Sequence, residues 1–126
     1  MSTKWLEDLP ESCPPSDAYA SNETFYRLVS NNPPKISDFW SNRKIFPQTP
    51  FPDLDECLIK SCSIISTIEE CKKRRKHSRF KDKRILKFYL NRDIGVIKKT
   101  FGRCHFSWWV SANLDINTLL YEFIDD

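Results

Sequence analysis

The side chains most able to bind a ligand form one dense run of cations. Residues 72–84 contain nine of the twenty basic residues and one acid, so the segment carries +8 and leaves −5 for the rest of a chain whose net charge is +3. Such a run attracts phosphates, because neutralising them releases counterions, and Phe80 within it can stack on a base. A solvated helix end that binds nothing has the same composition. The expected polyanion-binding residues are Lys72, Lys73, Arg74, Arg75, Lys76, Arg79 and Lys81.

Arg27 is a second residue able to do chemistry, because it lies in the middle of an apolar segment, residues 25–29. A strand with apolar side chains on both faces is normally buried, and a buried guanidinium without a partner is costly. The sequence therefore predicts that Arg27 contacts a carboxylate, backbone carbonyls or an anionic ligand. A structural partner and a bound ligand both satisfy this requirement.

His105 belongs to an alternating segment, residues 104–111. The even-numbered residues from Cys104 to Val110 are apolar, and the odd-numbered residues between them are a mixture of polar and apolar types. The mixed set of odd-numbered residues predicts a half-exposed strand face. On such a face a histidine beside a hydroxyl can line a pocket and move protons near neutral pH. An ordinary half-exposed strand has the same pattern. The residues expected on this face are His105, Ser107, Trp109 and Ser111.

The five cysteines are Cys13, Cys57, Cys62, Cys71 and Cys104. Their odd number and the lack of a dense framework predict reduced thiols that mostly fill the core. Three of them, with Cys104 or His105, can also be read as soft metal ligands. Their spacing differs from the tight Cys-x2-Cys of most zinc ribbons, so we expect no metal site.

Several common catalytic motifs are missing. The chain has two glycines, Gly95 and Gly102. A phosphate-cradling loop needs closely spaced glycines, so neither a Walker loop nor a dinucleotide fingerprint fits. The sequence also has no His-Glu-x-x-His and no nucleophile elbow. We therefore expect no cofactor on these grounds.

Periodicity predicts the elements that position these residues. We expect strands at 25–29, 61–66, 84–90, 95–99 and 104–111. Short helices are expected after Ser37, Asp53 and Thr67, and a helix is expected over 114–124. Strands clustered late in the chain favour an α+β class. We predict an N-terminal arm, 1–24, and a single α+β domain, 25–126, with a mainly antiparallel sheet and several short helices.

The location and the partners follow from what the sequence lacks. No stretch approaches the ~20 apolar residues of a membrane span. Acidic residues follow the N-terminal methionine closely and no apolar signal region appears, so we expect a cytoplasmic protein with no membrane partner. The sequence gives no oligomeric state.

Two segments support a resemblance over most of the chain. One is Phe25-Tyr26-Arg27-Leu28-Val29, followed by Asp38-Phe39 and Cys62-Ser63-Ile64-Ile65-Ser66; the other is Gly95-Val96-Ile97-Lys98-Lys99-Thr100, followed by His105-Phe106-Ser107-Trp108-Trp109. Together they resemble a group of small uncharacterised bacterial proteins. This resemblance implies no particular activity.

A remoter resemblance is to ADP-ribosyltransferase-like domains. It implies that Arg27 holds the phosphates of NAD and that Ser63 or Ser66 is the serine of the middle strand. This sequence departs from the family because no Glu-x-Glu or Gln-x-Glu occurs. Glu122, in the tail expected to be helical, is the only late glutamate. The implied catalytic residues are Arg27, His105 and Glu122.

Three functional hypotheses remain from the sequence. The first is a small intracellular accessory or interaction protein, of the kind encoded in toxin–antitoxin or defence loci, that contacts nucleic acid or an acidic partner through the basic segment. The alternative is an ADP-ribosyltransferase-like enzyme that uses NAD. The third is a structural or inhibitory partner of another protein, with no small-molecule site.

Overall fold

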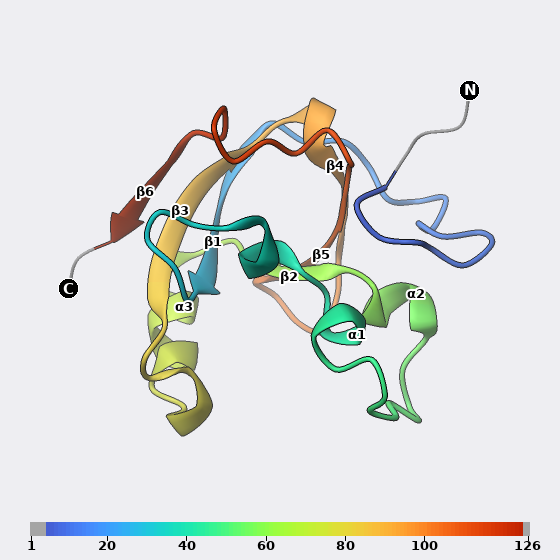
Figure 1. The fold of residues 1–126 in the computed structure, drawn as a ribbon, viewed down its shortest axis with the longest axis horizontal. Coiled ribbons are helices and arrows are strands. Elements are labelled where there is room, and N and C mark those ends of the chain that lie inside the picture. The colour runs from blue at the N-terminus through green and yellow to red at the C-terminus, as the bar shows by residue number, and fades with distance from the viewer. Residues whose placement is uncertain (1–4, 125–126) are drawn as a thin grey trace.

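One six-stranded antiparallel sheet organises the chain. The computed structural model describes residues 5–124, and residues 1–4 with Asp125 and Asp126 lie outside this part. The strands run in the order β4-β5-β2-β1-β3-β6, with β6 and the N-terminal arm at opposite ends of the sheet (Figure 1). Their bounds are β1 Glu23–Val29, β2 Cys62–Ile65, β3 Arg84–Leu90, β4 Gly95–Lys99, β5 His105–Val110 and β6 Tyr121–Ile124.

The helices are short. They are α1 (Asn42–Ile45), α2 (Glu56–Ile59) and α3 (Ile68–Arg75), with the 3₁₀ turns η1 (Ile36–Phe39), η2 (Ser78–Phe80) and η3 (Arg92–Ile94). The sheet and these helices agree with the expected mainly antiparallel α+β class. Thr67 caps α3 as predicted, by accepting from the backbone N–H of Glu70 at 3.3 Å. The other two expected caps are wrong, because Lys35 precedes η1 and Asp55 caps α2.

The main core covers one face of the sheet and is rich in aromatic residues. Trp108 is fully buried and stacks on Phe88 with ring centroids 5.5 Å apart. Phe39, from η1, packs edge-on against both rings, at 6.0 Å from Phe88 and 5.8 Å from Trp108. The indole N–H of Trp108 donates to the carbonyl of Ile94 at 3.0 Å. The buried indole is therefore fixed by both stacking and a hydrogen bond.

The opposite face of β5 is also buried, which corrects a prediction. Residues His105, Ser107 and Trp109 were expected to be half-exposed, yet each is at most 5% exposed. The indole N–H of Trp109 donates to the carbonyl of Cys57 in α2 at 2.9 Å. Alternation correctly separated the two faces of this strand. It could not show that α2, about fifty residues earlier in the chain, meets the second face at Trp109, or that α3 packs beside His105.

The tail is a strand and not the helix that we predicted. Residues Tyr121–Ile124 form β6, which pairs with β3. Leu119 is buried whereas Leu120 is 70% exposed, so the apolar residues taken for a helical face do not share one side. Pairing with β3 gives the backbone groups of this segment hydrogen-bond partners, whereas a short isolated helix would be only marginally stable.

A disulfide joins the N-terminal arm to α2, so the prediction of reduced thiols is wrong for Cys13 and Cys57. The two residues are 44 positions apart in sequence, and their Cα atoms are 5.6 Å apart. Cys62, Cys71 and Cys104 are free. Disulfides persist mainly in oxidising compartments, so this bond does not support the expected cytoplasmic location.

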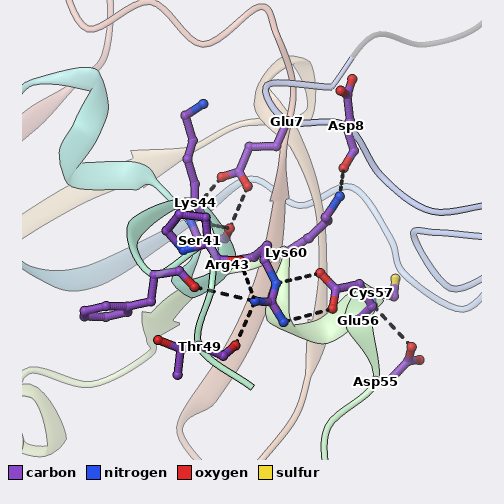
Figure 2. A network of polar contacts seen from close by, with 12 residues as sticks. Glu7, Asp8, Ser41, Arg43, Lys44, Thr49, Asp55, Glu56, Cys57 and Lys60 are labelled. Atoms are coloured by element: carbon purple, nitrogen blue, oxygen red, sulfur yellow. Dashed lines mark hydrogen bonds and ion pairs between the residues drawn. The ribbon is translucent and has the colours of Figure 1, made fainter. Parts of the chain in front are cut away.

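The arm is also held by polar contacts, several of which appear in Figure 2. The Glu7 carboxylate accepts from the backbone N–H and the hydroxyl of Ser41, at 2.9 and 2.6 Å, and Ser41 caps α1. The Lys60 ammonium donates to the carbonyl of Asp8 at 2.7 Å. The arm is thus part of the fold, and Glu7 connects it to a buried helix cap.

Arg43 closes the loop that connects α1 to α2. Its guanidinium donates to both carboxylate oxygens of Glu56, at 2.9 and 3.2 Å, and to the carbonyl of Thr49 at 2.8 Å. These contacts surround the guanidinium in Figure 2. Arg43 therefore orders a proline-rich loop that has little secondary structure of its own.

Replacing Trp109 by alanine should destabilise the protein by about 3–5 kcal/mol, because it removes a fully buried indole. Trp108→Ala should cost a similar amount. Urea denaturation followed by circular dichroism measures both changes. A much smaller loss for Trp109→Ala would mean that Trp109 is not buried against α2.

Protein purified without reductant should contain three titratable thiols after denaturation, corresponding to the three free cysteines. Reduction should lower the free energy of unfolding by up to about 4 kcal/mol, because the bond closes a loop spanning 44 positions. Thiol titration and denaturation with and without dithiothreitol test this. Five free thiols in protein prepared under air would contradict it.

Candidate functional site

The three implied catalytic residues, Arg27, His105 and Glu122, do not come together. Arg27 lies opposite Leu86 of β3, and Leu86 lies opposite Phe123 of β6. Glu122 is adjacent to Phe123 in β6, and adjacent residues of a strand point to opposite faces, so Glu122 lies on the opposite face of the sheet from Arg27. Its side chain is 65% exposed and pairs with Lys87 at 3.3 Å. His105 is in β5, which β2, β1 and β3 separate from β6.

The Arg27 guanidinium binds backbone carbonyls, one of the three kinds of partner that the sequence allowed. Nε donates to the carbonyl of Asp38 at 2.6 Å, and Nη1 to that of Ser63 at 2.6 Å. Nη2 makes a longer contact, 3.5 Å, with the carbonyl of Trp40. Arg27 thereby joins β1 to β2 and to the segment around η1. This arrangement supports a structural role.

Asp38 is a buried polar residue whose role the sequence analysis missed. Its carboxylate accepts from the backbone N–H groups of Ser30 and Lys35, both at 2.9 Å, and from the Asn31 side chain at 3.1 Å. These contacts close the loop between β1 and η1. The available signal was an aspartate at the start of a helical turn, where such side chains commonly accept backbone hydrogen bonds.

His105 belongs to a short network of hydrogen-bonded polar side chains. The Thr100 hydroxyl contacts Nδ1 of His105 at 3.0 Å and the hydroxyl of Ser107 at 2.8 Å. Burial, followed by the charge of Arg74, lowers the pKa of His105 from 6.5 to about 4. The imidazole is therefore neutral near pH 7. Because Ser107 is fully buried, this network stabilises the interior and offers no exposed nucleophile.

The basic segment is displayed on the surface, and we call residues 72–84 the basic ridge. Helix α3 packs through Cys71, which is fully buried in a small cluster with Ile65 and Ile85. Burial raises the pKa of the Cys71 thiol to about 11. Because one side of the helix faces the sheet, its other side faces solvent. In Figure 1, α3 and the turn after it extend beyond the end of the sheet. The exposed cations here include Lys72, Lys73, Lys76, Arg79 and Lys81.

Some cations of the ridge are engaged within the protein. Arg74 pairs with Glu70 at 3.3 Å, Arg79 lies over the ring of Phe80 at 4.8 Å, and Lys83 donates to the Ser30 hydroxyl. Arg75 and Arg84 also have interaction partners. Within the ridge, the ammonium groups of Lys72, Lys73, Lys76 and Lys81 have no ion pair or hydrogen bond to any of residues 5–124.

The surface hollows lie elsewhere. One of about 610 Å³ lies beside β6 and is lined by residues that include Pro33, Ile36, Leu119 and Tyr121. None of the three implied catalytic residues lines it, and Glu122 lines a separate hollow of about 310 Å³ over β3 and β6. Within residues 5–124 no group of three or more histidine, cysteine or acidic side chains is placed to hold a metal ion. Cys57, one of the possible soft ligands, is in the disulfide.

Comparison with known proteins adds no homologue. The chain has no match among protein-family models, curated proteins or solved structures. No helix of the described part has the length and hydropathy needed to cross a membrane. The functional inference therefore depends on the geometry of the basic ridge.

Stability should fall as the pH drops from about 6.5 to about 4, because the unfolded histidine protonates before the buried His105 does. The loss from this residue is at most about 3 kcal/mol. Urea denaturation at several pH values measures it, and His105→Gln should have a smaller pH dependence in this window. Equal pH dependence in both proteins would contradict a depressed pKa.

Proposed function

We propose that this protein binds a polyanion, above all nucleic acid, through the basic ridge. The observation that carries the proposal is the exposure of four unpaired ammonium groups on one short stretch: Lys72, Lys73, Lys76 and Lys81. Cations on a solvated helix often pair with neighbouring acids. The ridge contains one acid, Asp82, against nine cations, and the charges of these four lysines are available to a partner.

The chemistry of the ridge favours phosphate contacts over base-specific recognition. A lysine ammonium is a compact, strongly hydrated charge on a flexible stem, suited to phosphates in many geometries. The Arg79 guanidinium already lies over Phe80, so that ring is partly covered. The proposed binding is therefore electrostatic and largely independent of sequence.

Within this proposal the protein is a small accessory or interaction protein, of the kind encoded in toxin–antitoxin or defence loci. An acidic protein surface is the other partner that the ridge would suit. The ADP-ribosyltransferase alternative has no supporting observation, because the Arg27 donors are committed to carbonyls and Glu122 lies on the opposite face of the sheet.

Replacing Lys72, Lys73 and Lys76 together by glutamine should weaken binding to a labelled oligonucleotide at least roughly tenfold at moderate salt. The slope of log affinity against log salt should become shallower by about one for each phosphate that the variant no longer neutralises. Fluorescence anisotropy across a salt series measures both quantities.

The matched control replaces Lys35, Lys44 and Lys87 by glutamine, which removes the same charge away from the ridge. It should bind almost as the wild type does. Equal losses in the two triple variants would indicate a general charge effect and would reject the ridge as the site. An affinity that does not change with salt would reject polyanion binding altogether.

A further inference from the structure

The turn between β4 and β5 presents an exposed aromatic ring between two cations. We call residues 99–103, Lys-Thr-Phe-Gly-Arg, the hairpin tip. Phe101 is 58% exposed, and Lys99 and Arg103 on either side of it are exposed as well. Neither cation has an ion pair within residues 5–124. The tip therefore combines a solvent-facing ring with unpaired positive charge.

The ring is held in place although it is exposed. Phe101 has φ 52°, a left-handed conformation that is costly for a bulky residue and that often marks functional positions. Its ring packs edge-on against His105 with centroids 5.3 Å apart. The imidazole is itself anchored by Thr100, whose backbone N–H also donates to the carbonyl of His105 at 3.0 Å. One side of the Phe101 ring therefore packs against an imidazole that is itself held in place.

The tip lies beside the helix that carries the basic ridge. The carbonyl of Cys104, next to the tip, accepts from the backbone N–H of Ser66 at 2.9 Å. The hydroxyl of Thr67, the cap of α3, contacts the Cys104 sulfur at 3.8 Å. Arg74 of the ridge is close enough to lower the pKa of His105, the residue that supports Phe101. A single extended ligand can therefore reach both the tip and the ridge.

We infer that the ligand is single-stranded nucleic acid, with a base stacked on Phe101 and phosphates held by Lys99, Arg103 and the ridge. This inference rests on the proposed function and names the class of polyanion. Aromatic rings beside a cationic track bind single strands, because every unpaired base offers a face for stacking. In a duplex those faces are already stacked, and separating them costs a few kcal/mol per step.

The test compares Phe101→Ala with the wild type by fluorescence anisotropy at one moderate salt concentration. The probes are an oligothymidylate of about 20 nucleotides, longer than the site size of typical single-strand-binding domains, a duplex of equal length, and heparin as competitor. We expect wild type to prefer the single strand. Phe101→Ala should bind the single strand about tenfold more weakly, with an unchanged inhibition constant for heparin once the competition is corrected for the weaker probe binding.

Two further variants make the result specific. Phe101→Trp keeps a stacking ring and should retain wild-type affinity for the single strand. Phe46→Ala removes another exposed ring, 47% exposed, from the end of α1 and should have no effect. Circular dichroism establishes that each variant is folded. If Phe101→Ala does not fold, Phe101→Leu, which keeps apolar bulk without a ring, takes its place in the test.

The outcomes separate this inference from the proposed function. Unchanged single-strand affinity in Phe101→Ala, or tighter binding of the duplex by wild type, overturns the inference. If the triple lysine variant of the ridge still loses affinity in that case, the proposed function stands. If wild-type protein binds neither nucleic acid nor heparin, both fail.

Discussion

The burial of two consecutive tryptophans on opposite faces of β5 is the constraint on which the rest of the structure depends. Trp108 and Trp109 are both fully buried, so both faces of the sheet must be covered at this point. Aromatic packing around Phe39 and Phe88 covers one face, and α2 covers the other through the hydrogen bond to Trp109. The helices available are only four to eight residues long. Loops and the N-terminal arm therefore complete the cover.

Covering a sheet with loops leaves polar groups inside the protein, and this explains its buried hydrogen bonds. Loops do not satisfy their own backbone groups as helices do. Arg27 supplies donors to the carbonyls of Asp38 and Ser63, and the Asp38 carboxylate accepts from the loop that precedes it. Arg27, which the sequence suggested as a catalytic residue, and Asp38 therefore use their polar groups to hold irregular segments together.

The same constraint leaves the positive charge outside. Helix α3 contributes one small buried side chain, Cys71, to the sheet, so most of its circumference stays in solvent and accommodates lysine and arginine. Its cations lie near the helix C-terminus, where the dipole favours them. The hairpin tip extends from the buried strand β5 and is positioned by it. The proposed binding surface thus combines a cationic helix, anchored to the sheet through Cys71, with an exposed ring that packs against buried His105.

The sequence by itself determined the local features: the five strands before the tail, the Thr67 cap, the two parities of β5 and the concentration of charge in residues 72–84. Each depends on neighbours in the chain, through periodicity, capping or composition. It also predicted that Arg27 needs a partner, without choosing among three kinds.

Only the tertiary structure decided which surfaces are covered. The face expected to be exposed around His105 is buried: α2 contacts it at Trp109, and α3 packs beside His105 through Cys71 against Ile65, the partner of His105 in β2. The arm meets α2 through Cys13 and Cys57, which are 44 positions apart. The tail pairs with β3 although its spacing favoured a helix, because sheet pairing satisfies its backbone. Phe101 became part of a candidate site because hairpin closure places its ring on His105. Such long-range contacts arise from packing and chain reversal, which local patterns do not encode.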